Sequence, residues 1–136
     1  MKPMIGLLIV THCDLGTEFL KAAEFIIGRI DLVDTISITQ SLDSDHIRKT
    51  IGEKIAALNQ GNGVLILTDM FGGTPSNLSL SFLKDEQVEV LTGVNLPMLI
   101  AFVQNRSDLK LKELAEKAEK AGKVGISVAG KLLESE

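Results

Sequence analysis

The sequence predicts an α/β fold: a mainly parallel, doubly wound sheet of strand order 2-1-3-4 with helices on both faces. Three observations predict it. Short runs of apolar and β-branched residues alternate four times with longer segments of helical spacing, as in βαβ units. Two of those runs are apolar almost throughout, as expected of strands buried on both faces. The length of 136 residues suits one core, so residues 1–136 are expected to form a single domain.

Strands are expected where apolar or β-branched runs end at turn-forming residues. The predicted strands are Met4–Val10, Val33–Thr39, Gly63–Asp69 and Gln87–Thr92. The β-rich segment Lys123–Ala129 could add a last strand near the C-terminus. Because the connections between parallel strands must cross over right-handed, the intervening segments are expected to cover the sheet.

Helices are expected between these strands, where apolar residues recur every three or four positions. The predicted helices are Leu15–Gly28, a helix capped by Asp43 or Ser44 that runs to Leu58, Pro75–Leu83, a helix that follows Gly93–Pro97 and ends near Asn105, and Leu109–Ala121. Gly28 is a plausible stop, and Thr74 suits an N-cap before Pro75 at the first helical position. Gly122 is expected just after the end of the last helix.

Composition excludes several classes of function. The formal charge is −4, from 14 Lys and Arg against 18 Asp and Glu, which argues against a nucleic-acid partner. No apolar run approaches the roughly 20 residues that cross a bilayer, and no signal peptide is recognised. Cys13 is the only cysteine, so an internal disulfide is excluded and a reducing, cytoplasmic location is expected.

The predicted topology indicates where a functional site should lie. In doubly wound sheets, ligands bind beyond the carboxyl ends of the strands, where the strand order reverses. The first strand ends in Thr11-His12-Cys13-Asp14, and the third ends in Thr68-Asp69. In the order 2-1-3-4 these two ends are neighbours at the switch point.

His12 and Asp69 are the candidate catalytic pair. An imidazole can act as a nucleophile, a base or a metal ligand near neutral pH. If Asp69 accepts a hydrogen bond from one ring nitrogen, it fixes the tautomer and leaves the lone pair of the other nitrogen free to attack. A histidine that only caps a helix or binds a loop carbonyl is an equally weighted alternative.

The loop Gly72-Gly73-Thr74-Pro75 is a second candidate element, suited to holding a phosphoryl group. Two glycines allow the backbone to approach a ligand at positive φ, and a helix that starts at Pro75 presents free N–H groups. Thr74 and Ser76 would add hydroxyl donors. A plain turn before a capped helix explains the same residues about as well, and neither a Walker A nor a dinucleotide motif is present.

Other chemistry is less well supported. His12, Cys13, Asp14 and Asp69 could supply some ligands to a metal, but the paired His or Cys spacing of a zinc site is missing, so no metal is expected. A reactive thiol is an alternative for Cys13 near a helix start, although a small half-buried residue is the simpler interpretation. No cofactor is implied by any motif.

Four segments taken together resemble a known family. They are Ile9-Val-Thr-His12, the helix Leu20–Gly28, Thr68-Asp-Met-Phe-Gly-Gly-Thr-Pro-Ser-Asn77 and Gly93-Val-Asn-Leu-Pro-Met98. In this order and spacing, they resemble the IIA component (EIIA) of the mannose family of the bacterial phosphoenolpyruvate-dependent sugar phosphotransferase system (PTS). The resemblance covers essentially the whole chain.

The resemblance implies a phosphoryl carrier that needs no cofactor. His12 would accept a phosphoryl group from the phosphocarrier HPr, through Nε2, and pass it to a separate IIB component, with an indirect link to a membrane permease. Asp69 would bind Nδ1 of His12, and Thr11, Phe71, Gly72, Gly73 and Thr74 would surround the phosphoryl group. Members of the family are homodimers, so Lys123–Ala129 would be an antiparallel strand swapped into the partner's sheet. Cys13 departs from the glycine common at its position, which could make activity sensitive to oxidation.

Three alternatives stay open. A regulatory carrier without a transport role would have the same residues. The phosphoryl-donor subunit of a dihydroxyacetone kinase has a related fold but lacks the Gly-Gly-Thr-Pro loop. A receiver-type or small-ligand module would need an acidic pair after the first strand, where this chain has Thr11-His12. The sequence leaves the sugar and the identity of the IIB partner open.

Overall fold

The computed structural model describes residues 4–41 and 43–134. Its four strands are β1 (Gly6–His12), β2 (Val33–Ile38), β3 (Val64–Thr68) and β4 (Val88–Thr92). Its helices are α1 (Leu15–Ile27), α2 (Ser44–Leu58), α3 (Thr74–Leu80), α4 (Leu96–Asn105), α5 (Leu111–Val124) and α6 (Ala129–Glu134). Strands and helices alternate up to α4, which is the predicted βαβ pattern.

The sheet has the predicted order, β2-β1-β3-β4, and every pairing between its strands is parallel. The central strands β1 and β3 are paired from Gly6–Val64 to Val10–Thr68. Their side chains are buried on both faces, which explains why both runs are apolar without alternation. The sheet is therefore covered on two sides, as the fold class requires.

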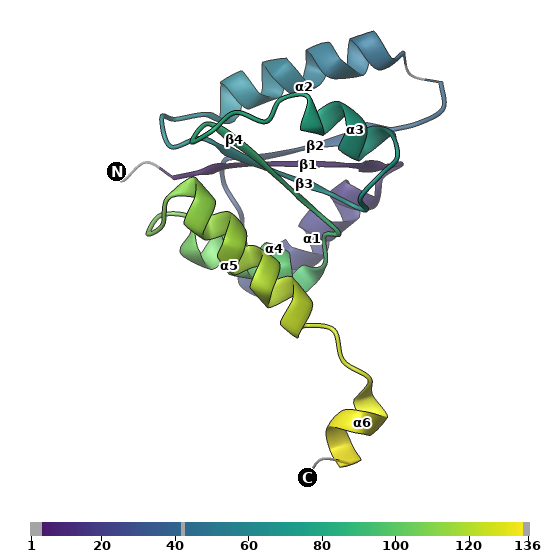
Figure 1. The fold of residues 1–136 in the computed structure, drawn as a ribbon, viewed down its shortest axis with the longest axis vertical. Helices are drawn as coiled ribbons and strands as arrows, with labels where there is room; N and C mark the ends of the chain where they lie inside the picture. The colour runs from purple at the N-terminus through teal and green to yellow at the C-terminus, as the bar shows by residue number, and fades with distance from the viewer. Residues whose placement is uncertain (1–3, 42, 135–136) are drawn as a thin grey trace.

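Alternate residues of β1 and β3 build one core on each face of the sheet. Leu7 and Leu65 belong to the core formed with α1, α4 and α5, where Phe102 is fully buried. Leu8 and Ile66 belong to the core formed with α2 and α3. Figure 1 shows this three-layer arrangement, with α2 and α3 on one side of the sheet and α1, α4 and α5 on the other.

Two predicted helix ends are wrong by a few residues. Gly122 lies inside α5, and Gly125 is the residue that caps it. A Cβ on Gly122 would lie 2.9 Å from Cε of Met98, so this glycine is explained by the close approach of α4 rather than by a helix end. The third helix also ends earlier, at Leu80 instead of Leu83, and its N-cap is Gly73 rather than Thr74.

The predicted last strand, Lys123–Ala129, is not formed within this chain. Lys123 and Val124 complete α5, the next residues have no sheet partner in the described chain, and α6 begins at Ala129. A β-rich composition makes a strand only when a neighbouring strand offers hydrogen bonds. Ile126 and Val128 are consequently exposed, and α6 stands away from the three layers (Figure 1).

None of the helices in the described ranges combines the length and the apolar character needed to cross a membrane.

Candidate functional site

The site begins where β1 outlasts β3. The pairing of the two strands ends at Val10–Thr68, whereas β1 remains paired with β2 as far as His12–Ile38. The backbone N–H of His12 points to the β3 side, where the strand has ended, and it donates to Oδ2 of Asp69 at 2.9 Å. The Asp69 carboxylate thus accepts the hydrogen bond that a backbone carbonyl of β3 would accept if the strand continued. This bond brings His12 and Asp69 together, as predicted.

The same carboxylate oxygen orients the imidazole of His12. Nδ1 of His12 lies 2.8 Å from Oδ2 of Asp69, so the predicted hydrogen bond is present. An ionised carboxylate only accepts hydrogen bonds, so Nδ1 carries the proton and Nε2 has the free lone pair. The His12 side chain is 47% exposed, against 10% for Asp69. A nucleophilic nitrogen is therefore held at the surface by a largely buried anion.

The hydrogen bonds to Asp69 keep it ionised. Burial by itself raises the pKa of Asp69, but the backbone N–H and the ring of His12 outweigh burial and hold the pKa below its ordinary value. The second oxygen, Oδ1, accepts from the backbone N–H of Met70 at 3.1 Å. Both oxygens of the carboxylate are thus fixed by donors.

The glycine loop lies against the ring of His12. Gly72 and Gly73 both have positive φ, at 91° and 84°, as the sequence predicted for this loop. A Cβ on Gly73 would lie 3.2 Å from Cε1 and 3.4 Å from Nε2 of His12, so a side chain there would crowd the reactive nitrogen. Thr74 follows as the exposed first residue of α3, directly after the N-cap residue Gly73.

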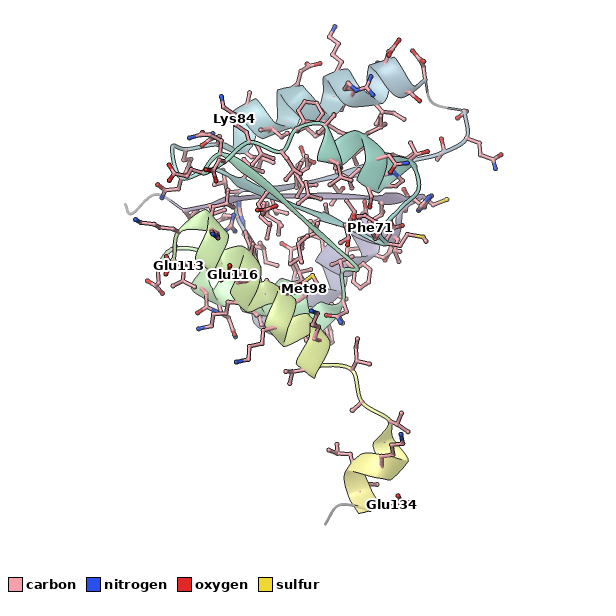
Figure 2. The ribbon with its side chains drawn as sticks, viewed as in Figure 1. Phe71, Lys84, Met98, Glu113, Glu116 and Glu134 are labelled. Atoms are coloured by element: carbon pink, nitrogen blue, oxygen red, sulfur yellow. The ribbon has the colours of Figure 1, made fainter. Side chains whose placement is uncertain are left out.

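Exposed apolar side chains follow both His12 and Asp69 closely in the sequence. Phe71 is 75% exposed, and Met70 and Leu15 are also exposed. Figure 2 shows Phe71 at one end of the sheet, with Lys84 and Glu113 at the opposite end. An open, polar surface depression lined by Lys84 and Glu113 lies at that opposite end, away from His12. The His12 ring and Phe71 are therefore both accessible at the surface.

Two predicted phosphoryl contacts point inward instead. Thr11 is fully buried, and its hydroxyl accepts from Gly16 N at 2.8 Å and donates to the Cys13 carbonyl at 3.3 Å. Ser76 is also fully buried, and its hydroxyl is bonded to Thr68 and to the carbonyl of Met70. Both hydroxyls hold the loops that carry the site, a role that the sequence pattern alone did not indicate.

Cys13 is exposed at the start of the loop after β1 and has a positive φ of 49°. Its backbone N–H donates to Ile38 at 2.8 Å, which extends the pairing of β1 with β2 by one residue. No three His, Cys, Asp or Glu side chains gather as metal ligands in the part of the chain that the structure describes.

Comparison with known proteins places this arrangement in a family. The sequence model described as "PTS system fructose IIA component" (EIIA-man) matches residues 6–119. The chain therefore belongs to the mannose-type EIIA family of the PTS. The resemblance found in the sequence motifs is confirmed.

Individual relatives agree with this assignment. The mannose-specific EIIAB component of Escherichia coli (strain K12) is 32% identical over 124 residues, which cover 90% of this chain and 38% of that protein. The fructose-specific EIIA component of Bacillus subtilis (strain 168) is 26% identical over 132 residues, covering 96% and 90% of the two chains. The chain thus spans little more than a third of the E. coli relative.

Solved structures share the fold. The phosphotransferase system component EIIA from Streptococcus agalactiae superposes with a TM-score of 0.85 at 28% identity, covering 94% of this chain and 99% of that one. The mannose/sorbose-specific IIA subunit from Enterococcus faecalis gives 0.81 at 24% identity, over 94% and 95% of the two chains, and is compared for its fold only.

Proposed function

We propose that this chain is a phosphoryl carrier of the PTS that accepts a phosphoryl group on His12. The observation that carries the proposal is the bond between Nδ1 of His12 and Asp69, which leaves Nε2 as an exposed nucleophile. Family membership supports the same role. The expected donor is phospho-HPr and the expected acceptor is a IIB component, through which the carrier is linked to a membrane permease.

The transfer needs no group besides those on the two proteins. The phosphorus–nitrogen bond of the donor breaks and a bond from phosphorus to Nε2 of His12 forms. Nδ1 keeps its proton, and the positive charge that develops on the imidazole faces the ionised carboxylate of Asp69. Because the transition state is loose, positioning and charge stabilisation supply most of the catalysis.

The loop of Phe71 to Thr74 is the proposed cradle for the phosphoryl oxygens. Gly73 lies next to Nε2, and Thr74 is exposed beside it in the sequence. Backbone N–H groups near the start of a helix favour anions. Phe71 is exposed and would be covered by a docked partner. Thr11 is left out of this cradle because its hydroxyl is buried and already bonded.

The test is the mass of the intact protein after incubation with phosphoenolpyruvate, enzyme I and HPr. One acid-labile phosphoryl group is expected on the wild type and none on His12→Ala. Label on the variant would rule out His12 as the acceptor. No label on the wild type, with components that phosphorylate another EIIA, would overturn the carrier function. Addition of candidate IIB components then tests onward transfer, which separates transport from a purely regulatory role.

A homodimer is proposed as the working assembly. β4 is an edge strand, and the exposed Ile126 and Val128 would gain hydrogen bonds and burial if they paired with the sheet of a second copy. Ile126 lines the same open surface depression as Leu91 and Thr92 of β4. Native mass spectrometry is expected to give a dimer, and a chain that ends at Gly125 is expected to give a monomer. A monomeric full-length chain would contradict the proposal.

A further inference from the structure

Two buried hydroxyl groups connect the backbone on either side of Asp69. Thr68 precedes Asp69 at the end of β3, and Ser76 lies in the first turn of α3; both are fully buried. Oγ1 of Thr68 lies 2.8 Å from Oγ of Ser76. The Ser76 hydroxyl donates to the carbonyl of Met70, the residue after Asp69.

The direction of these bonds follows from the number of protons. A serine hydroxyl has one proton, and Ser76 gives it to Met70, so Thr68 must be the donor to Ser76. The result is a chain of hydrogen bonds from Thr68 through Ser76 to Met70. It joins β3, α3 and the glycine loop within the span from Thr68 to Ser76.

The connected backbone is fixed to the sheet. The carbonyl of Thr68 accepts from the N–H groups of Gly93 and Val94, at 2.9 and 3.0 Å, so Thr68 is anchored beyond the end of the ladder. Beyond Asp69, the loop contains two successive residues with positive φ, Gly72 and Gly73, whose backbone has unusual freedom. Ser76 connects the start of this loop to the end of β3.

A hydroxyl group at a fully buried position calls for a structural explanation. Burying one costs free energy unless it is hydrogen-bonded, and an apolar residue would fill the same interface without that cost. Here the hydroxyl bonds join Thr68 and Met70, the two sequence neighbours of Asp69. The carboxylate of Asp69 accepts from the backbone N–H of Met70, and from the backbone N–H and Nδ1 of His12. A shift of Met70 would move one of those donors and the carboxylate with it.

We propose that Thr68 and Ser76 are positioning residues for phosphoryl transfer, which hold the Asp69 carboxylate against Nδ1 of His12 and hold the glycine loop beside Nε2. The inference rests on the proposed function of His12. Misplacement of reacting groups by a fraction of an ångström to an ångström costs up to about 100-fold in rate.

The experiment compares hydroxyl deletions on α3 and at the end of β3. Ser76→Ala and Thr68→Val remove the chain of bonds, and Thr68→Ser restores its hydroxyl. Ser79→Ala is the matched control, because Ser79 is equally buried on the same helix but donates to the Pro75 carbonyl, at 2.6 Å, away from Asp69. Two quantities are measured: the rate of phosphoryl uptake from phospho-HPr, and the NMR signal of the His12 Nδ1 proton in the unphosphorylated protein.

The expected result is a selective loss. Ser76→Ala and Thr68→Val should slow uptake by about 10-fold or more and weaken the Nδ1 proton signal through faster exchange with water. Ser79→Ala and Thr68→Ser should leave both unchanged, even where the free energy of unfolding falls. The inference is overturned if Ser76→Ala and Thr68→Val keep the signal and the rate, or if Ser79→Ala reduces both as strongly.

The NMR signal separates this inference from the carrier function. It needs no donor, so it reports on the His12–Asp69 bond even if the wild type accepts no phosphoryl group. A wild type that stays unlabelled would overturn the proposed function. Loss of the signal in Ser76→Ala but not in Ser79→Ala would still show that the hydroxyl chain positions Asp69.

Discussion

The Asp69 carboxylate selects which nitrogen of His12 can react. Its Oδ2 accepts hydrogen bonds from Nδ1 and from the backbone N–H of the same histidine, so ring and main chain are fixed by one oxygen. A histidine at the end of a strand would otherwise rotate about its side-chain bonds and present either nitrogen. The pair therefore combines an exposed reactive atom with a ring of fixed orientation.

The lowered pKa of Asp69 makes the stability of the fold sensitive to acid. Burial alone raises this pKa, but the bonds from His12 outweigh it, so the folded chain binds its proton at lower pH than the unfolded chain. The stabilisation is therefore present above the ordinary carboxyl pKa and is lost as the pH falls through the lowered folded value. We expect the free energy of unfolding to fall more on acidification in the wild type than in Asp69→Asn.

Urea unfolding of both proteins, at neutral pH and in acid, measures this difference. The other carboxylates are common to the two chains, so their contributions cancel in the comparison. A gap between wild type and Asp69→Asn that stays constant over the pH range would contradict the pKa direction. The same variant should also transfer phosphoryl groups more slowly while it remains folded at neutral pH.

At the scale of elements, the glycine loop and its neighbour helix offer a matched pair of substitutions. Gly72 and Gly73 both have positive φ, and the ψ of 171° at Gly73 lies in a region that almost only glycine adopts, so alanine should cost about 1–3 kcal/mol of stability, with the larger loss at Gly73. A Cβ on Gly72 would meet nothing within 4 Å, whereas one on Gly73 would press on the His12 ring. We expect Gly73→Ala to slow phosphoryl uptake strongly and Gly72→Ala to slow it little.

Uptake rates from phospho-HPr and unfolding curves for both variants decide the point. Much slower uptake by Gly73→Ala than by Gly72→Ala, measured where both variants are folded, would show that the close approach to His12 matters. Equal rates in the two variants would mean that the backbone conformation alone controls the loop, which contradicts the expected crowding.

A helix or strand could be predicted from the sequence where its residue pattern has a single structural explanation. β1 and β3 are buried on both faces, so their apolar runs were sufficient to predict two buried strands. Gly122 was wrongly predicted as a helix end because glycine occurs both after helices and where two helices pack closely. Here its lack of a side chain leaves room for Met98. The segment from Lys123 is not a strand in the single chain, because Lys123 and Val124 complete α5 and the residues from there to α6 pair with no strand among those described.

The site was predictable to the extent that topology places strand ends together. His12 and Asp69 are next to one another for that reason, and the glycine loop follows from its own composition. The directions of Thr11 and Ser76 were not predictable, because a hydroxyl beside a site can face the ligand or the backbone. A polar residue that continues an apolar strand, such as Thr68, was the available signal for a buried hydroxyl bond.

At the scale of the whole molecule, the end opposite His12 is held by a buried arginine. Arg106 follows α4, continues the buried face of Leu99 and Phe102, and is only 4% exposed. Its guanidinium donates to the carbonyls of Ile5, Asp31 and Leu32 at distances of 2.6–3.0 Å. It therefore joins the start of β1, the connection between α1 and β2, and the end of α4.

Arg106 should contribute strongly to stability and little to transfer. Burial lowers its pKa to about 10, and Asp31 offsets part of that effect, so the guanidinium remains charged at neutral pH. Arg106→Met keeps an apolar side chain but removes the guanidinium, whose carbon lies 5.2 Å from the centroid of the Phe102 ring. The carbonyls of Ile5 and Asp31 lose this donor, whereas the carbonyl of Leu32 still accepts from Leu7 N. An unsatisfied buried acceptor costs about 1–3 kcal/mol, so a loss of about 2 kcal/mol or more is expected in urea unfolding. Because the carbonyls lie at the far end of the sheet, the folded variant should accept a phosphoryl group at the wild-type rate.

Two outcomes would contradict this prediction. A loss of stability below about 1 kcal/mol, within the range of ordinary surface changes, would contradict the structural role of Arg106. Slow phosphoryl uptake by the folded variant would show that the two ends of the sheet are coupled.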